Sequence, residues 1–478
     1  MLFNSFQFLW FFPLVVILYY AMNHKYRWFL LLIASYYFYM CWKVEYIVLI
    51  VASTAIDYYA GIQMGKTEIK KKRKKFLILS LVMNLGLLFG FKYFNFFNDS
   101  FRDLFNHYNI LYDVPTFNVL LPVGISFYTF QTLSYSIDIY RGRSKPERHF
   151  GKFALYVAFF PQLVAGPIER SIKLLPQFSK KITFRHEQVV SGLKLMLWGF
   201  FKKVVIADRL ALFVGTIFNH PDESYGLPII LASILLHIQV YTDLSGYTDI
   251  ARGAARVFGI DIIKNFNMPL FARSFYDFWK RWHISLTTWF TDYLYIPLGG
   301  SRVVKWRWYF NIYAVFIISG LWHGANWTYV IWGVLHGLYQ LIEIWTDKSR
   351  RKFFEIVGLT KFPVLLKTLG VITTLLLVSF ATLFFGAHNL NDSFTLMQNA
   401  LQLGTLKDFI SVFDNELILG IFLIGFLMTT EYLNHKYNII RIIGNKHIII
   451  RWSIYILAII LVATFGVFEE LEFIYFQF

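Results

Sequence analysis

Long apolar runs alternate with short charged segments along the chain, and this pattern predicts helices that cross a membrane. Four of the runs, residues 6–22, 76–97, 368–386 and 454–468, are nearly free of charge. A helix needs about 20 such residues to cross the hydrocarbon core of a bilayer. Residues 6–22 lack a basic start and a small-residue cleavage pattern, so we interpret this run as a retained helix rather than a signal peptide.

The composition supports the same interpretation. The 478 residues are 57% hydrophobic and only 16% charged, whereas soluble domains carry about 25% charged residues. A water-soluble core cannot bury this surplus of apolar surface, which therefore needs lipid. The single cysteine, Cys41, excludes an internal disulfide framework and a multi-cysteine zinc site. Its aromatic surroundings predict a buried, inert thiol.

The formal net charge of +17 could indicate nucleic-acid binding, but its distribution argues against that. The basic residues stand in short loops between apolar runs, as the positive-inside rule predicts for cytoplasmic loops. Some attraction to anionic lipid headgroups follows as well. We therefore expect membrane lipid, and no nucleic acid, among the partners.

The charge alternation also predicts the topology. Residues 66–75 are strongly basic and should be cytoplasmic, the acidic loop 98–118 should lie outside, and the basic stretch 141–148 should lie inside again. Later segments continue the alternation, with residues 392–416 mostly acidic. The chain then ends on acidic residues 469–472, which should be extracytoplasmic. We expect an all-α, polytopic integral membrane protein with about 10–12 transmembrane or re-entrant helices.

One of these segments should be broken. Residues 159–167 contain two prolines and a glycine, and basic loops flank them on both sides. Irregular backbone at membrane depth is tolerated only where it is buried in protein or lines a wet cavity. We expect a cavity at this segment.

Polar residues inside apolar surroundings are costly, so they narrow the search for chemistry. They gather first in residues 267–300, a stretch too charged to span and too aromatic for a free loop. Its tryptophans stand beside Lys280 and Arg281, which predicts short helices at the headgroup level or re-entering from it. His283 lies in this stretch.

The second gathering is residues 319–327, followed by His336. If this stretch is one helix, Gly320, Asn326 and Trp327 share a face with His323, and His336 falls near the opposite face. The small residues would allow close approach by another helix or a ligand. On this spacing His323 and His336 should not form a compact metal pair.

Histidine is suited to moving a proton near neutral pH because its unperturbed pKa is about 6.5. A histidine at position 323 could therefore serve as a base, but it is equally compatible with a structural hydrogen bond. His237 and Asp243 are one residue too far apart for the H-x₄-D acyltransferase pattern, and a single helix would place them on different faces. Asp243 is expected to orient a helix or a histidine rather than to react.

Several segments together resemble the membrane-bound O-acyltransferase family. They are residues 121–131, 160–170, 282–290, 295–300 and 321–327, in that order along the chain. The first and last six residues are similar to its bacterial alginate O-acetyltransferase branch. The resemblance implies a single membrane domain over residues 1–478, with a motif-rich catalytic part at about 119–345 and less specific C-terminal helices at 361–478. It also implies a ring of tilted helices around a central tunnel.

The resemblance assigns roles to individual residues. His323 matches the family's catalytic histidine, and His283 matches its second signature polar residue. The substrate tunnel would be lined or braced by Trp322, Asn326, Trp327, Asp243 and Glu169. No metal and no bound cofactor are implied, and acetyl-CoA or another acyl thioester would be the donor substrate.

The function that follows is transfer of an acetyl group from a cytoplasmic thioester to a hydroxyl of an exported polysaccharide, or to a periplasmic acetyltransferase or esterase-like partner. The protein would lie in the inner membrane. Three alternatives stay open: D-alanyl transfer to teichoic acid, a proton-coupled transporter with broken helices, and a scaffold that only anchors a periplasmic complex.

Overall fold

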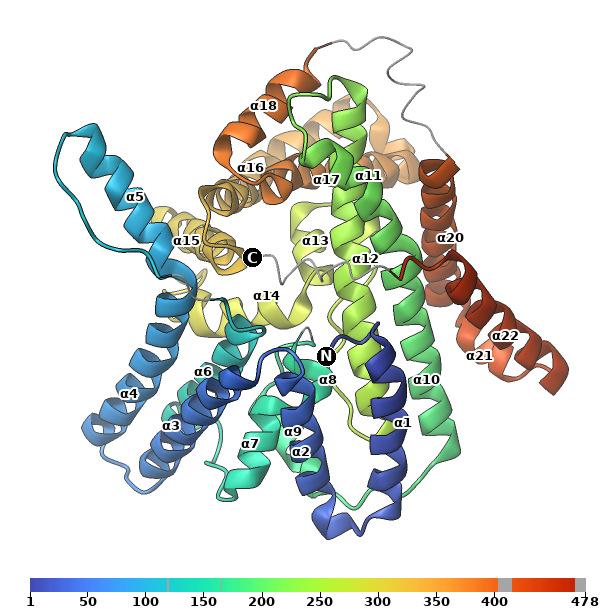
Figure 1. Ribbon diagram of the computed structural model, residues 1–478. Helices are drawn as coiled ribbons and strands as arrows, with labels where there is room; N and C mark the ends of the chain where they lie inside the picture. The colour runs from blue at the N-terminus through green and yellow to red at the C-terminus, as the bar shows by residue number, and fades with distance from the viewer. Residues whose placement is uncertain (118–119, 165, 403–414, 469–478) are drawn as a thin grey trace. The chain divides into compact units, whose positions relative to one another are not determined.

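The computed structural model describes residues 1–117, 120–164, 166–402 and 415–468 (Figure 1). Throughout these ranges the regular structure is helical, and no strand occurs. The all-α prediction is confirmed. The acidic residues 469–472, the last six residues and part of the acidic segment 392–416 fall outside the described residues.

Six helical stretches in the described part of the chain are long and apolar enough to cross a membrane. They are Val44–Gly65, Lys70–His107, Leu227–Val257, Pro363–Gly386, Asn415–Tyr437 and Ile448–Phe465. The last of these buries none of its most apolar window against protein, so its exposed isoleucine and leucine side chains require lipid. The helix Phe6–Ala21 is apolar but shorter. A multi-pass membrane protein is confirmed, while the count of 10–12 helices and the ring around a tunnel stay predictions.

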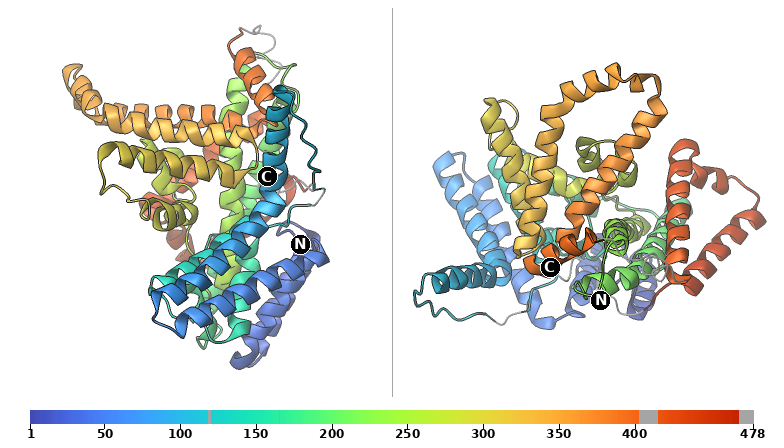
Figure 2. Two further views of the ribbon diagram at one scale, coloured as in Figure 1. Left: turned by 90° about the vertical axis from the view of Figure 1, so that its left-hand side faces the viewer. Right: turned by 90° about the horizontal axis from the view of Figure 1, so that it is seen from above.

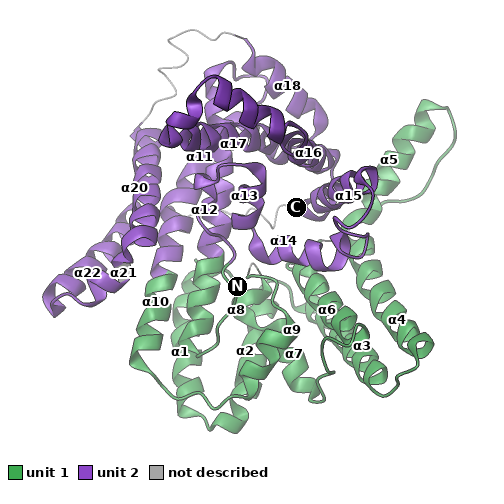
Figure 3. Ribbon diagram, turned by 180° about the vertical axis from the view of Figure 1, so that it is seen from behind, with its two compact units in different colours: residues 1–196, 248–264 green, residues 197–247, 265–478 purple. Residues whose placement is uncertain are grey.

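The chain divides into two compact units (Figure 3). Unit 1 comprises residues 1–196 and 248–264, and unit 2 comprises residues 197–247 and 265–478. Two helices contribute to both units: α10 (His186–Phe200) and α12 (Leu227–Val257). The other helices of unit 1 are α1 (Phe6–Ala21), η1 (His24–Tyr26), α2 (Arg27–Met40), η2 (Val44–Tyr46), α3 (Ile47–Gly65), α4 (Lys70–Leu88), η3 (Phe89–Tyr93), α5 (Phe94–His107), α6 (Ile125–Tyr140), α7 (Phe150–Ala158), α8 (Phe160–Leu163), α9 (Ser171–Leu174) and η4 (Leu175–Ser179).

A buried carboxylate ties three helices of unit 1 together. Asp57 of α3 accepts hydrogen bonds from Asn84 Nδ2 of α4 at 2.8 Å and from Ser136 Oγ of α6 at 3.3 Å. Ser80 of α4 donates to the same carboxylate at 2.5 Å. Because a buried charge is tolerated only when it is hydrogen-bonded, this cluster fixes the register of α3, α4 and α6.

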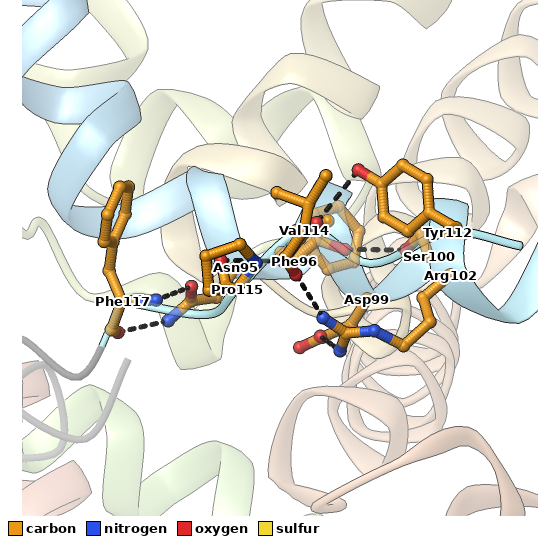
Figure 4. A network of polar contacts seen from close by, with 10 residues as sticks. Asn95, Phe96, Asp99, Ser100, Arg102, Tyr112, Val114, Pro115 and Phe117 are labelled. Carbon is orange, nitrogen blue, oxygen red and sulfur yellow. Dashed lines mark hydrogen bonds and ion pairs between the residues drawn. The ribbon is translucent and has the colours of Figure 1, made fainter.

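The segment after α4 differs from the loop predicted for residues 98–118. Helix α5 continues to His107, and the chain then returns along it in extended form (Figure 4). Asn95 holds the returning segment in place. Its Oδ1 accepts a hydrogen bond from Phe117 N at 2.9 Å, and its Nδ2 donates one to Phe117 O at 2.7 Å. Arg102 donates to Val114 O at 2.7 Å. Phenylalanines at helical spacing in α5 favour the helix over a loop.

The predicted break at residues 159–167 is confirmed. Helix α7 ends at Ala158, Phe159 is non-helical, and α8 covers only Phe160–Leu163. Phe159 and Phe160 are fully buried in protein. Phe160 N donates to Ser35 Oγ at 3.0 Å, which satisfies one backbone group that the break releases. Burial in protein thus accounts for the irregular backbone, and the cavity expected at this segment stays a prediction.

Cys41 is exposed, so the prediction of a buried thiol was wrong. It follows the last residue of α2 as the helix cap, where the chain leaves the packed helix face. Its aromatic neighbours in the sequence therefore do not surround it in space.

Unit 2 carries the remaining helices. They are η5 (Phe201–Ala207), α11 (Asp208–Phe218), η6 (Pro269–Phe271), α13 (Phe275–Arg281), α14 (Ile284–Phe290), η7 (Thr291–Tyr295), α15 (Lys305–His323), α16 (Trp327–Ile356), η8 (Leu359–Lys361), α17 (Pro363–Gly386), α18 (Leu390–Ala400), α20 (Asn415–Tyr437), α21 (Ile439–Gly444) and α22 (Ile448–Phe465). Helices α15 and α16 run side by side as a hairpin (Figure 2). Residues 267–300 fold into short helices, as predicted.

Candidate active site

The stretch around His323 is a helix–turn–helix and not a single helix. Helix α15 ends at His323, Gly324 is extended, and α16 begins at Trp327. Asn326 caps α16, because its Oδ1 accepts from Thr328 N at 3.1 Å, and its Nδ2 donates to His388 O at 2.8 Å. An asparagine cap satisfies one of the free N–H groups at a helix start. The expectation that Asn326 and Trp327 share a helix face with His323 was therefore wrong.

Small residues let the two arms of this hairpin touch, as predicted. A Cβ atom on Gly320 of α15 would stand 2.2 Å from Tyr329 O of α16. A Cβ atom on Gly333 of α16 would stand 2.4 Å from Phe316 O of α15. Backbone meets backbone at both positions, so the partner that the glycines accommodate is the neighbouring helix.

His323 is buried at the end of α15 and is surrounded by aromatic rings. Its ring centroid lies 5.0 Å from that of Trp322, 5.0 Å from that of Trp332 and 5.6 Å from that of Phe385. Only 3% of the His323 surface is exposed, so these neighbours largely shield the imidazole from bulk water. A buried, fixed imidazole is suited to directed proton transfer.

The His323 imidazole borders a narrow cavity of about 20 Å³ within unit 2. A space of this size holds one or two water-sized groups. Four of the walls are aromatic. The lining residues are His237 and Val240 of α12, Phe278 and Trp282 at α13, His323 of α15, Trp332 and His336 of α16, and Val378, Thr382 and Phe385 of α17.

His336 and His237 line this cavity together with His323. The sequence pattern predicted neither of them as a site residue. The expected position of His336 depended on one continuous helix. Because α16 folds back along α15, His336 instead faces the same cavity as His323. The signal that could have shown this is Gly324 followed by Asn326, a typical helix end and helix start.

His283 is fully buried and occupies the cap position of α14 with φ +41°. Asn265 holds this turn, since its backbone oxygen accepts from Ile284 N at 2.8 Å and its Oδ1 accepts from Ser285 N at 3.0 Å. Burial lowers the pKa of His283 well below its ordinary value.

A tryptophan links the two signature histidines. The Trp322 ring centroid lies 6.2 Å from that of His283 and 5.0 Å from that of His323. The two imidazoles therefore flank one indole. Neither His283 nor Trp322 is among the residues that line the cavity.

Asp243 belongs to a buried ion cluster rather than to the cavity. Lys203 Nζ of η5 lies 2.8 Å from Asp243 Oδ1 of α12 and 2.8 Å from Asp208 Oδ1 of α11. The Tyr247 ring lies 5.5 Å from the same ammonium group. This ion pair joins α12 to η5, and the orienting role expected for Asp243 stays a prediction. His237 on the same helix stacks on Trp282 with 5.3 Å between ring centroids.

Glu169 and Trp327 are not among the residues that line the cavity. Glu169 belongs to unit 1, where its carboxylate is buried and accepts from Ile263 N. Trp327 is the first residue of α16 and is 47% exposed. Of the five residues predicted to line or brace a tunnel, Trp322 alone contacts both signature histidines.

Three histidines in one cavity raise the question of a metal. In the ranges that the structure describes, no group of three or more histidine, cysteine, aspartate or glutamate side chains is arranged to hold a metal ion. The geometry offers imidazole nitrogens for proton transfer and hydrogen bonding in an apolar enclosure.

Comparison with known proteins gives a consistent set of similarities. Residues 38–367 match the model of the membrane-bound O-acyltransferase family. The chain is 38% identical to the probable alginate O-acetylase AlgI of Pseudomonas aeruginosa, over 85% of this chain and 76% of that protein. It is 34% identical to the peptidoglycan O-acetyltransferase of Helicobacter pylori, over 73% of this chain and 69% of that protein. A teichoic acid D-alanyltransferase of Bacillus subtilis is 28% identical over 49% of this chain and 63% of that protein.

Proposed function

Because the chain belongs to the membrane-bound O-acyltransferase family, we propose that this O-acyltransferase moves an acetyl group from a cytoplasmic acyl thioester to a hydroxyl of an exported polysaccharide. A periplasmic transferase or esterase-like partner is the second possible acceptor. The observation that carries the proposal is His323, buried on the wall of a small cavity that aromatic rings help to line.

In this reaction a bond forms between the acceptor hydroxyl oxygen and the thioester carbonyl carbon, and the carbon–sulfur bond breaks. His323 takes the hydroxyl proton as the oxygen attacks, and returns it to the departing thiolate sulfur. A positioned base of this kind contributes about 10²–10⁴ in rate. His283, whose ring contacts Trp322, would position the thioester or its departing thiol.

The charge pattern supports a cytoplasmic donor. Arg302 and Lys305 follow the His283 region directly, and basic residues of this kind mark the cytoplasmic face. We place the protein in the inner membrane, with the C-terminal end on the extracytoplasmic side. The acyl group would then pass from a donor inside to an acceptor outside.

The cavity favours acetyl over D-alanyl transfer. A D-alanyl group carries an ammonium ion, which is costly to bury without a partner of opposite charge. The residues that line the cavity include no carboxylate, and the space is small enough to suit a two-carbon group. D-alanyl transfer is therefore the second candidate.

The test uses the full chain purified in lipid nanodiscs and given acetyl-CoA labelled in the acetyl group together with a polysaccharide that carries free hydroxyl groups as the acceptor. We expect labelled product and stoichiometric release of free thiol, both lost in His323→Ala. His435→Ala, at an exposed histidine of α20, serves as the matched control and should retain both.

Three outcomes would contradict the proposal. Folded wild-type protein that cleaves no acyl thioester while moving a solute across the membrane would indicate a transporter. Unchanged polysaccharide acetylation in cells that carry His323→Ala, with complex assembly dependent on the loops, would indicate a scaffold. Transfer from a D-alanyl thioester alone would replace the acetyl assignment by the second candidate.

A further inference from the structure

His237 and His336 border the same cavity as His323, and the proposed reaction does not yet use them. Both side chains are buried, at 3% and 0% exposure. Among the described residues, neither ring nitrogen of His336 has a hydrogen-bond partner. Each is therefore a polar ring placed in an enclosure that otherwise favours apolar side chains.

The surroundings of the two rings are aromatic. His237 stacks on Trp282 with 5.3 Å between ring centroids and 24° between planes. His336 lies 4.5 Å from Trp332 and 5.2 Å from Trp279 by ring centroid. Aromatic carbon edges offer an imidazole N–H no hydrogen-bond acceptor, whereas buried polar groups are nearly always hydrogen-bonded. The space that both rings share is the cavity.

We propose that His237 and His336 bind the carbonyl oxygen of the acyl group and stabilise the negative charge that develops on it during transfer. This inference rests on the proposed function, because it needs an acyl group in the cavity. The three histidines that line the cavity then have two different roles. His323 takes the proton, while the N–H groups of His237 and His336 face the oxygen.

The chemistry of the transfer step calls for such donors. As the hydroxyl oxygen adds to the carbonyl carbon, the carbonyl oxygen becomes an oxyanion, and it returns to a carbonyl when the carbon–sulfur bond breaks. N–H donors held ready at that oxygen act most strongly in a water-excluded site. The lining residues of this cavity include four aromatic side chains and no carboxylate that would compete for the donors.

The positions of the rings fit this division. Trp332 contacts two of the histidines, with its ring centroid 5.0 Å from that of His323 and 4.5 Å from that of His336. A base and an oxyanion donor must approach the reacting carbon from different sides, because the attacking oxygen and the carbonyl oxygen are different atoms.

Two analogues of acetyl-CoA test the proposal by binding alone. Acetonyl-CoA keeps the carbonyl but has a methylene group between sulfur and carbonyl carbon, so no transfer occurs. S-propyl-CoA lacks the carbonyl. With full-length protein in nanodiscs, we expect wild type to bind the ketone roughly three- to tenfold more tightly than the thioether, as one or two hydrogen bonds would provide.

His336→Phe and His237→Phe preserve the ring shape and remove the donor, so each should reduce this preference toward unity. His336→Gln and His237→Gln, which retain an N–H, should restore part of it if a Phe variant fails to fold. His435→Phe is the control and should bind both analogues as wild type does. Infrared spectra of ¹³C-carbonyl acetonyl-CoA should show a carbonyl stretch lowered in wild type and returned toward its value in an apolar solvent in the Phe variants.

The outcomes separate this proposal from the proposed function. Phe variants that keep both the ketone preference and the lowered carbonyl stretch would overturn the role of His237 and His336, while thioester transfer by wild type would still stand. Wild-type protein that binds neither analogue and cleaves no acetyl thioester would overturn the proposed function and this inference with it.

Discussion

The imidazole of His323 meets the indole of Trp332 edge to face, with ring centroids 5.0 Å apart and planes inclined by 78°. Trp332 is thus a wall of the small cavity as well as a support for the proposed base. The size of the cavity should therefore depend on this side chain.

Trp332→Leu should enlarge the cavity and relax its selectivity for acyl length. We expect kcat/KM for the acetyl thioester to fall, because His323 loses its contact with the Trp332 ring. The ratio of kcat/KM for propionyl or butyryl thioester to that for acetyl thioester should rise. A series of acyl-CoA donors measures both effects. The control is Phe380→Leu, at a residue of the same helix as Phe385 that is 41% exposed. An unchanged dependence on acyl chain length in Trp332→Leu would show that Trp332 does not limit the size of the cavity.

Gly320→Ala should destabilise the α15–α16 hairpin. A methyl group there would stand 2.2 Å from Tyr329 O, so the two helices must separate. Overpacking of this kind costs about 1–3 kcal/mol, and thermal unfolding in detergent measures it. Gly425→Ala of α20 is the matched control, because its methyl group would meet no atom within 4 Å. A Gly320→Ala variant as stable as that control would refute the close contact.

Lys203→Met should be among the most destabilising single changes in unit 2. It would leave Asp208 and Asp243 buried without their ammonium partner, and breaking a buried pair costs about 3–5 kcal/mol. The triple variant Lys203→Met, Asp208→Asn, Asp243→Asn should recover much of the loss. For comparison, Arg351→Met removes an exposed pair with Asp347 and should change the unfolding temperature little. Failure of the triple variant to recover stability would show that the cluster acts by more than charge.

The buried imidazole of His283 should make stability depend on pH. Burial lowers its pKa, so below about pH 6.5 the unfolded chain binds a proton that the folded protein excludes. Stability should therefore fall as pH falls, by up to about 1.4 kcal/mol per pH unit for this one group. His283→Asn should show a shallower loss than wild type between pH 6.5 and 5 in denaturation curves. Parallel curves for the two proteins would contradict the burial of a neutral ring.

The predicted topology can be tested with the chain's one thiol. Cys41 is exposed, so Cys41→Ser should be tolerated and gives a background without cysteine. In that background, a cysteine at Lys71 should react with membrane-impermeant maleimide only after the cytoplasmic side is opened. A cysteine at Asp103 should react in intact cells. Labelling of both from the same side would reject the charge-based topology.

The helical class and most long helices were predictable because lipid demands continuous apolar runs. Residues 6–22 and 368–386 correspond to α1 and α17 with ends that differ by a few residues. The break at residues 159–167 was equally visible, since proline and glycine act locally.

The arrangement of the site was less predictable. His323 was identified as the candidate catalytic residue by resemblance, and that role stays a prediction. Its neighbours depended on a turn at Gly324 that helical spacing ignores. The position of His336 depended on the same turn, whereas His237 became visible as a cavity residue only in three dimensions, because α12 is far in sequence from the other helices that line the cavity.

The backbone at His283 has an implication for how this chain balances folding against activity. A φ of +41° lies in the left-handed region of backbone conformation, which glycine adopts without strain. A residue with a Cβ atom adopts it at a steric cost of roughly 1–2 kcal/mol. Selection for stability alone would therefore favour a glycine here. The chain instead has an imidazole at this position and offsets its cost through Asn265, which bonds to the two following backbone N–H groups. Stabilising substitutions found in this protein without an activity screen should thus include losses of this side chain.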